Sequence, residues 1–509
     1  MHFAAGLLLA LLPRTGLFWP RAVAKNCPPT APLQNYAANK SKTLNGMPNT
    51  NFALPGIVGP AGDESMVPKS NAGKPTGVTM QEEAKNRLDR RSLGHLAAKT
   101  AAMDFENLVA EPRTETGNVV WTLRAILTSG LVGMAAGCKG LAEVERLTDA
   151  MGKGARRLFN LPARLPDTTA GDVLVRLNCD DLRKVLYQFC NRAYRAKQFV
   201  HDMPVRAVVL DGKATSTFLH DAIGAITRFA QVNSATGKAL VRTVTACLVT
   251  TPARPCLDAC PIPAETNECG IYIRALDDLL AAYGRKLFDV VMYDSGAASL
   301  ANATATVLRM LDYVFILDNF QPTLYAEAVR LLANKALGTA DAKHADVAGG
   351  ELVERYIWVS NKMTGWLDWT HCKTVVRVCC VRTDKTTGAV IVENHYYISS
   401  LHHRKLLPLQ WIELLRRRWS VENQNHNTFD TIFAEDDRPF LLRPQGMLVV
   451  MLLRRIAYNM LAILRSVTTR GETKRATPWR EFLQRNYDGL IRASQQTLEG
   501  LRRRTAIAS

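Results

Sequence analysis

Long uninterrupted hydrophobic runs are missing from this 509-residue sequence. The longest candidate, residues 447–464, is broken by Arg454 and Arg455 and therefore predicts a buried helix rather than a membrane span. Residues 3–13 are apolar and the triplet at 22–24 resembles a cleavage site, but no Lys or Arg precedes the apolar run as in a secretory signal. We therefore expect a cytoplasmic protein without membrane contact.

Cysteines offer neither a disulfide framework nor a convincing zinc site. The 11 cysteines are an odd number and are scattered through segments typical of a globular interior, which favours reduced thiols. Cys256, Cys260 and Cys269 lack a fourth Cys or His at a suitable spacing, and Cys379-Cys380 lies in a strand-like run. Buried thiols are the better interpretation.

Acidic residues are outnumbered, with 46 Asp and Glu against 64 Lys and Arg, and the net charge is +18. Residues 401–509 carry half of that surplus, with 19 basic and 10 acidic residues. Such a surplus attracts polyanions through the summed field of many side chains, so nucleic acid is the leading partner and a solvated basic face is the alternative. The expected phosphate contacts are Arg416–Arg418, Arg454-Arg455, Lys474-Arg475 and Arg502–Arg504.

Two compositional changes divide the chain before its strands begin. Residues 25–100 are rich in Pro, Gly, Asn, Ser and Lys without a hydrophobic period, so we expect residues 1–100 to be mostly disordered or to precede a true start codon near residue 100. Helical spacing of apolar residues predicts a small all-helical domain over 101–198. A helix expected within 165–177 either recognises DNA or only packs against its neighbours.

Strands and helices alternate from residue 199 onward. Apolar, β-branched runs predict four strands separated by helices or a loop, and three more strand-like runs follow between residues 350 and 400. The four strands are expected at 207–210, 240–250, 287–294 and 313–318. This order predicts an α/β catalytic core over 199–465 with a β-rich insertion at about 320–402, preceded by the helical domain and followed by a basic helical tail over 466–509.

Two aspartates directly follow apolar runs of this predicted core. Asp211 and Asp294 stand where α/β folds place ligand-binding groups. A helix cap or turn is the simpler explanation for either one alone, above all for Asp294, because Ser295 and Gly296 favour a turn. Neither aspartate predicts a site without further acidic residues.

A third acid is more informative. Helical spacing of four puts Arg418, Glu422 and His426 on one face of a helix, with a surface ion pair between Arg418 and Glu422 as the alternative. Three carboxylates from separate elements would suit Mg²⁺ or Mn²⁺, which prefer oxygen ligands. Two such ions support in-line displacement at a phosphodiester bond, so the pattern indicates DNA cleavage and strand transfer.

Fragments around these acids occur in the order found in one family. They are VVLDGKA around Asp211, TNECG around Glu268, VVMYDSGAAS around Asp294, YVFILDNFQPTLYAE around Asn319 and Gln321, HYYISSL at 395–401 and RRRWSVENQNHNTFDTIFAEDDR around Glu422. Over roughly residues 120–465 the chain resembles the DDE insertion-sequence transposases with an RNase H-like core, in particular the H-repeat-associated group with a β insertion before its final Glu.

This resemblance implies a DNA transposase that cleaves insertion-sequence ends and transfers the strands into target DNA. It implies that Asp211, Asp294 and Glu422 are catalytic and bind Mg²⁺ or Mn²⁺. The partner would be double-stranded DNA, bound by a homodimer at the bacterial nucleoid. The residues expected to bind DNA are Arg418, at a phosphate near the scissile bond, and Lys213, Asn319, Gln321, Trp419, Asn423, His426, Arg416 and Arg417.

Departures from the family pattern leave two rival hypotheses open: an RNase H-like nuclease that cuts without joining, and a domesticated or inactive DNA-binding relative. Trp358, Trp366 and Trp369 in the insertion either stack on a flipped base or belong to the core. The departures are Leu415 in place of an aromatic residue, Phe429 in place of Lys, Ser295 in place of Ala and Asp318 in place of Lys.

Overall fold

The computed structural model describes residues 80–114, 119–218, 230–233, 238–438, 440–441, 443–469, 471 and 477–508. The signal-like segment at 3–24 and the basic pair Lys474-Arg475 lie outside these residues. Strands and helices of the described chain form the mixed α/β architecture that their order in the sequence predicts.

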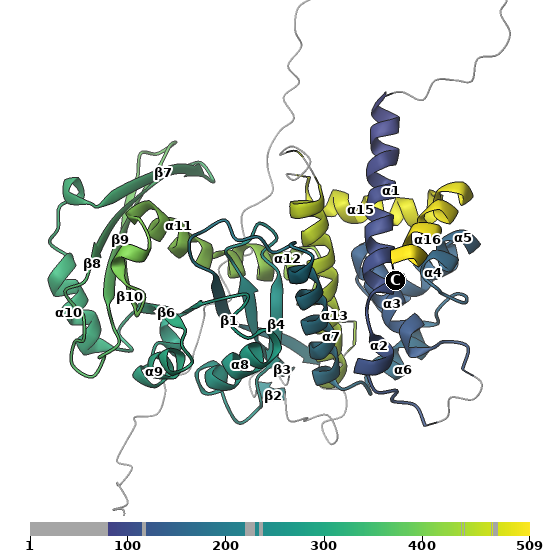
Figure 1. Cartoon of the computed structure of the whole chain (residues 1–509), viewed down its shortest axis with the longest axis horizontal. Coiled ribbons are helices and arrows are strands. Elements are labelled where there is room, and N and C mark those ends of the chain that lie inside the picture. Colours follow the sequence, from purple (N-terminus) through teal and green to yellow (C-terminus); the bar gives the residue numbers. More distant parts are fainter. Residues whose placement is uncertain are drawn as a thin grey trace, which may run out of the picture. The chain divides into compact units, whose positions relative to one another are not determined.

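A ten-stranded sheet runs through the described chain (Figure 1). Its strands are β1 (Ala207–Phe218), β2 (Ala230–Asn233), β3 (Lys238–Leu248), β4 (Cys256–Pro261), β5 (Val290–Tyr293), β6 (Asp312–Leu317), β7 (Ala342–Ala348), β8 (Glu351–Ser360), β9 (Thr374–Asp384) and β10 (Val390–Ser399). The order is β2-β3-β1-β5-β6-β10-β9-β8-β7, and β4 also pairs with β3. β3 is antiparallel to β1 and β4, whereas β1, β5 and β6 are parallel.

The strands differ from the sequence expectations in four places, and one of them is the short strand β2, which was not expected. β1 does not end before Asp211, because its polar second half pairs with β3 as far as Phe218 opposite Lys238. The Pro/Cys-rich loop contains β4, in which Cys256 and Cys260 are buried against the helical core. The edge strand β7 was not expected, since its alternating, mostly exposed residues bury little apolar surface.

The β-rich insertion is part of the main sheet. Its three expected runs form β8, β9 and β10, and Tyr396–Ser399 of β10 pair with Val314–Leu317 of β6 in antiparallel register. The helix α10 (Pro322–Leu332) packs against β9 and β10. The insertion therefore lengthens the sheet beyond β6 instead of forming a separate layer.

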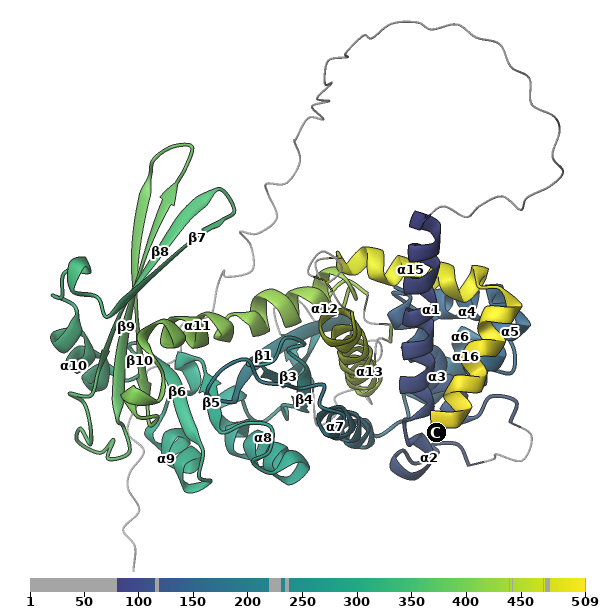
Figure 2. The same ribbon diagram turned by 45° about the horizontal axis from the view of Figure 1, so that its top comes forward.

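Different helices cover the two faces of the sheet (Figure 2). Since side chains alternate along a strand, Val208 and Leu210 pack on one face and Val209 on the other. The first face is covered by α8 (Glu268–Tyr283) and α9 (Leu300–Leu308), and the second by α11 (Pro408–Arg418). Trp411 of α11 is fully buried beneath this second face.

Helices from both ends of the chain form a helical region beside the sheet. They are α1 (Met80–Ala101), α2 (Phe105–Leu108), α3 (Leu123–Ala135), α4 (Leu141–Ala150), α5 (Lys153–Leu158), α6 (Asp167–Leu174), α7 (Cys179–Arg195), α13 (Pro444–Ile463), α15 (Trp479–Arg492) and α16 (Gln495–Ala508). The structure places α1 inside the segment expected to be disordered, and α1 packs against α15 and α16. The described C-terminal helices are thus part of this region rather than a free tail.

The helix α13 lies at the centre of this region and packs against α3, α7 and β4. The stretch Pro444–Thr468 is long and apolar enough to cross a membrane, yet the apolar window within it is 100% buried inside the protein. Its arginines Arg454 and Arg455 are 1% and 0% exposed and pair with the buried Glu435. The expectation that these arginines contact phosphates is therefore wrong.

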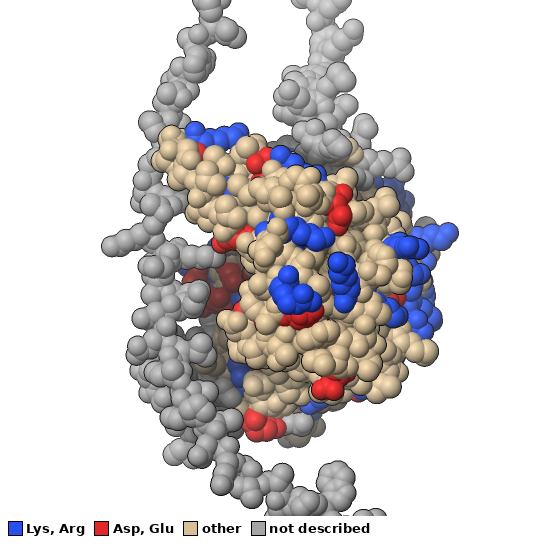
Figure 3. All heavy atoms as spheres, turned by 90° about the vertical axis from the view of Figure 1, so that its left-hand side faces the viewer, with Lys and Arg blue, Asp and Glu red and all other residues tan. Residues whose placement is uncertain are grey.

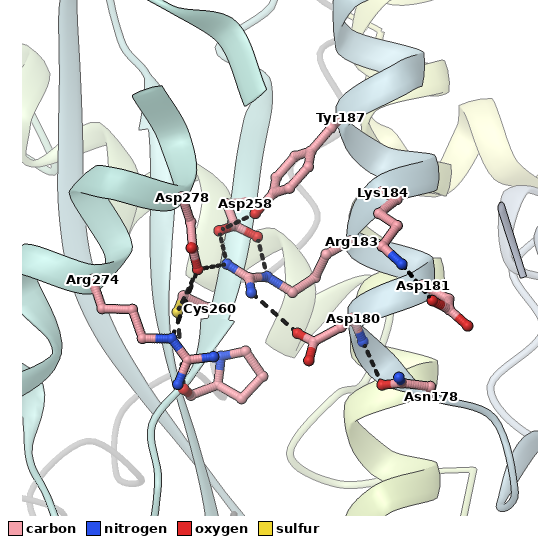
Figure 4. A network of polar contacts seen from close by, with 11 residues as sticks. Asn178, Asp180, Asp181, Arg183, Lys184, Tyr187, Asp258, Cys260, Arg274 and Asp278 are labelled. Atoms are coloured by element: carbon pink, nitrogen blue, oxygen red, sulfur yellow. Dashed lines mark hydrogen bonds and ion pairs between the residues drawn. The ribbon is translucent and has the colours of Figure 1, made fainter. Parts of the chain in front are cut away.

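A buried ion-pair network fastens the helical region to the sheet (Figure 4). Arg183 of α7 donates to Asp258 of β4 at 3.0 and 2.6 Å and to Asp278 of α8 at 2.8 Å. Tyr187 donates a further hydrogen bond of 2.8 Å to Asp258. Burial alone would lower the pKa of Arg183, but the facing carboxylates raise it above its ordinary value, so the network is charged and structural.

Candidate functional site

Asp211 lies in the middle of β1, opposite Thr245 of β3. Alternation along the strand places it on the same face as Val209, the face that α11 covers. The side chain is 15% exposed, and His426 Nδ1 lies 3.3 Å from its Oδ2. Asp211 is therefore a largely buried carboxylate held within a strand, not a residue that follows one.

Asp294 directly follows β5, as the sequence predicts. Val209 of β1 pairs with Met292 of β5 in parallel register. The two aspartates each follow two residues later in the chain, so they occupy neighbouring positions. Asp294 caps the short helix η1 (Ser295–Ala297) by accepting 2.7 Å from the Ser295 amide. The same oxygen, Oδ1, lies 3.1 Å from Arg418 Nη2, so capping accounts for only part of its environment.

Glu422 lies on a π-helical turn, η4 (Val421–His426), that continues the helix begun by α11. The sequence predicted a regular α-helix, and Arg418 and Glu422 do pair at 3.9 Å as spacing of four requires. His426, at the end of the same wider turn, contacts Asp211. All three side chains still reach the same site.

Arg418 forms ion pairs with two of the three acids. Its side chain is 3% exposed and lies over the ring of Trp419 at 4.8 Å. Nη2 pairs with Asp294 and Nη1 lies 3.9 Å from Glu422 Oε1, but among the described residues neither Nη1 nor Nε finds a hydrogen-bond acceptor. Because unpaired buried N–H groups are costly, this guanidinium is prepared for a further acceptor, such as a phosphate oxygen.

The pKa values show an excess of negative charge at the site. Burial, and after it the charge of Glu422 with smaller contributions from Glu268 and Asp294, raises the pKa of Asp211 to about 8 against the opposing effect of Arg418. Burial lowers the pKa of His426 to about 3, so its imidazole is neutral at ordinary pH. Carboxylates that disfavour one another's ionisation in this way are typical of cation sites before the cation binds.

The donor set fits a hard divalent cation by chemistry. Asp211, Asp294 and Glu422 supply carboxylate oxygens, and their repulsion is of the kind that Mg²⁺ or Mn²⁺ would relieve. In the described part of the chain, no three His, Cys, Asp or Glu side chains lie close enough to hold one ion as they stand. Arg418 now pairs with two of the three acids and would have to release them.

Several residues expected to bind DNA are engaged within the protein. Lys213 is 7% exposed and pairs with Asp430 at 2.5 Å and with Asp436 at 3.3 Å. Arg417 pairs with Asp202 and, at 2.7 Å, with Glu413. In this structure both basic side chains form ion pairs that hold elements of the protein together. The sequence motifs that predicted DNA contacts for them did not reveal these ion pairs.

Other expected contacts remain open. Asn319 and Gln321 follow β6, one strand beyond the strand that leads to Asp294, and Asn319 is exposed. Trp419 is 39% exposed beside Arg418, whereas Trp358 is fully buried and Trp369 is 6% exposed. Core packing therefore accounts for Trp358 and Trp369, while Trp366 is only partly buried.

A cavity of about 460 Å³ lies between part of α11 and the face of β8, β9 and β10. Arg416 on its wall pairs at 2.6 Å with Asp346, which also pairs at 2.6 Å with Arg355. On the face shown in Figure 3, Lys and Arg of the described residues occur in separate groups with Asp and Glu among them. The cavity is lined by residues that favour a polar ligand, namely Arg355, Arg382, His395, Arg416, Trp419 and Asn423.

Comparisons with known proteins find a structural likeness but no relative in sequence. No protein-family model matches the sequence, and no curated protein matches it. Among solved structures, a piggyBac transposase in a synaptic complex with hairpin DNA aligns with a TM-score of 0.34 and 12% identity, over 78% of this chain and 79% of that chain. The function is therefore argued from the site itself.

Proposed function

We propose that the protein is a DDE-type DNA transposase, which cuts phosphodiester bonds at the ends of its own element and joins them to target DNA. The observation that carries this proposal is the convergence of Asp211, Asp294 and Glu422, from three elements far apart in sequence, around the buried Arg418. Glu422 raises the pKa of Asp211, which supports a shared site for the two acids.

The sheet supports an RNase H-like core for this enzyme. Five strands follow in the order β4-β3-β1-β5-β6, with three antiparallel strands and then two that run parallel to β1. A central first strand that carries one acid, and a parallel neighbour that ends at another, is the arrangement expected of that fold. Ligand groups in α/β proteins gather at such strand ends.

In this proposal Asp211, Asp294 and Glu422 would hold Mg²⁺ or Mn²⁺. Bound cations supply activation of the attacking hydroxyl and stabilisation of the leaving 3′ oxygen. Arg418 would offer Nε and Nη1, which make no hydrogen bond within the described residues, to a phosphate near the scissile bond. His426 holds Asp211 in position, and the exposed Trp419 and Asn423 face double-stranded DNA, which a homodimer of the chain would bind.

The test uses purified protein and DNA fragments that carry the sequences flanking its own coding region. With Mg²⁺ we expect cleavage at the element ends and joining to a second DNA, and neither product with chelator. Asp211→Asn and Glu422→Gln should abolish both steps and retain DNA binding. Glu265→Gln, an exposed acid outside the site, is the matched control and should behave as wild type.

The rival functions predict different products. A nuclease that cuts without joining would give Mg²⁺-dependent cleavage but no joined DNA. A DNA-binding relative without turnover would bind the same fragments and cut none of them. Cleavage that persists undiminished in Asp211→Asn would overturn the assignment of the site.

A further inference from the structure

Arg254 lies in the turn between β3 and β4 with its backbone in the left-handed region, at a φ of 44°. A residue other than glycine is strained in that region, so an arginine here has a conformational cost that glycine would avoid. Three buried groups nevertheless hold its carbonyl: Asn425 Nδ2 donates 3.2 Å, the Tyr458 hydroxyl 3.4 Å and Cys247 Sγ 3.5 Å. These contacts fix the point from which the Arg254 side chain extends.

The contact with Asn425 connects Arg254 to the candidate site. Asn425 is a fully buried residue of η4, the same π-helical turn that carries Glu422. The Arg254 side chain lines a cavity of about 280 Å³ together with Glu413, Arg416, Arg417, Trp419, Asn423 and Gln424. The Arg418 guanidinium lies 4.8 Å from the centre of the Trp419 ring. The cavity is thus next to the arginine of the candidate site, with the Trp419 side chain in contact with both.

The three arginines of this cavity differ in their partners. Arg416 and Arg417 each pair with two acids, and Glu413 is one of the two for both. Arg254 forms no ion pair within the described ranges of the chain. Among the described residues that line the cavity, Glu413 is the sole acid, so three arginines face one carboxylate there. The cavity therefore has an excess of positive charge, and Arg254 is the cation available to a ligand.

We propose that Arg254 binds a phosphate of the DNA backbone in this cavity, with Asn423 and Gln424 as further donors. The choice of DNA as the source of the phosphate rests on the proposed function. A guanidinium can form two parallel hydrogen bonds with phosphate oxygens, and side-chain amides donate to the same oxygens. Arg254 then takes the role that the sequence predicted for Arg417, whose charge is already neutralised within the protein.

The first test measures binding of a duplex DNA fragment by fluorescence anisotropy at several salt concentrations, with chelator present so that binding is separated from metal-dependent cleavage. Arg254→Gly should weaken binding about tenfold, the loss of one hydrogen bond to a charged group. The slope of log affinity against log salt concentration should become shallower by about 1, as expected when one phosphate contact is removed.

Lys197→Gly is the matched control. Lys197 is an exposed basic residue that also has a positive φ, of 54°, and it does not line the cavity. Its substitution removes the same charge at a similar backbone conformation, so the DNA affinity and the salt slope should stay as in wild type. Equal losses in Lys197→Gly and Arg254→Gly would overturn the inference.

Two further measurements distinguish a phosphate contact from a merely structural role. In Arg254→Gly the relief of strain and the added freedom of the unfolded chain oppose each other, so the unfolding temperature should stay close to that of wild type. A decrease of several degrees together with weaker binding would show that Arg254 supports the fold instead. Arg254→Lys keeps the charge without the guanidinium fork, so it should retain the salt slope and bind with an affinity between those of wild type and Arg254→Gly.

The outcomes also separate this inference from the proposed function. If wild type cleaves DNA, and Arg254→Gly binds DNA with the affinity and the salt slope of wild type, only the phosphate contact is wrong. If wild type binds DNA and cleaves none, while Arg254→Gly still has the shallower slope, the phosphate contact holds and the transposase assignment fails.

Discussion

Two groups of charged residues, one around Glu435 and one at the candidate site, show opposite arrangements of charge. In the cluster around Glu435, one carboxylate faces Arg454 and Arg455, and all three side chains are at most 1% exposed. In the candidate site, carboxylates outnumber cations, and Asp294 and Glu422 are 52% and 39% exposed. Buried charges that face opposite charges stabilise the fold, whereas partly exposed acids that outnumber their one arginine are available to bind a cation.

Lys213 is a buried cation near both groups. It lies two residues after Asp211 on the same face of β1, but it turns to Asp430 and Asp436 rather than to the acids of the site. Its charge also contributes, after burial, to the low pKa of His426. The lysine therefore neutralises Asp430 and Asp436, which belong to neither group, and leaves the acids of the candidate site without its charge.

The largest effect is expected from Glu422→Gln. The change removes a proposed ligand from a partly exposed position, so DNA cleavage should fall on the order of 10³-fold or more, while the free energy of unfolding changes by about 0.5 kcal/mol or less. Cleavage assays and urea denaturation of the same preparation measure both quantities. If the free energy of unfolding fell so far that unfolding accounted for the lost cleavage activity, the distinction between the two groups would not hold.

Glu435→Gln should show the reverse. It leaves Arg454 and Arg455 buried without their carboxylate, so the free energy of unfolding should decrease by about 3–5 kcal/mol, as when one partner of a buried ion pair is removed. Urea denaturation checks this value. A loss below about 1 kcal/mol would show that the cluster is not structural.

The pH dependence of Mn²⁺ binding is the next smaller effect. Asp211, with its pKa raised to about 8, keeps a proton at neutral pH that the metal must displace, so affinity should fall about tenfold for each pH unit below 8 and level off above it. Without metal, stability should decrease as pH rises from about 4 to 8, because the unfolded chain has already released this proton. Calorimetry between pH 6 and 9 tests the slope; a flat profile would contradict it.

The smallest effect separates two neighbouring arginines. Arg418→Lys should slow DNA cleavage about tenfold. A lysine has a single point charge in place of the two guanidinium nitrogens that make no hydrogen bond, and the expected loss is similar to that of one hydrogen bond to a charged group. The control Arg417→Lys keeps a cation between Asp202 and Glu413 and should cleave as wild type. Equal effects of the two substitutions would show that Arg418 has no special contact.

Local patterns in the sequence predicted much of this arrangement. Apolar β-branched runs located β3, β5, β6 and the three strands of the insertion, since β-branched residues favour strands. Asp294 and Glu422 were predicted from the strand end and the helix that carry them. These features depend on neighbouring residues, which the sequence displays directly.

The remaining features depend on contacts between distant segments. The polar half of β1 is a strand because β3 pairs with it, and α1 is ordered against α15 and α16 from the other end of the chain. The π-helical turn at Glu422 has no periodic signal, and the pairing of Arg454 and Arg455 with Glu435 required the tertiary structure. Glu268 stood in a matched fragment, but its contact with Gly212 appears only in the fold.

The most direct test of the account replaces Asp211 with a ligand of different metal preference. A thiolate is a poor ligand for Mg²⁺ and a better one for Mn²⁺, so Asp211→Cys should cleave DNA in Mn²⁺ and fail in Mg²⁺, whereas wild type is active with both. Recovery in Mn²⁺ alone would show that this position contacts the catalytic metal. Asp211→Cys cleavage in Mg²⁺ at the wild-type rate would contradict the proposed site.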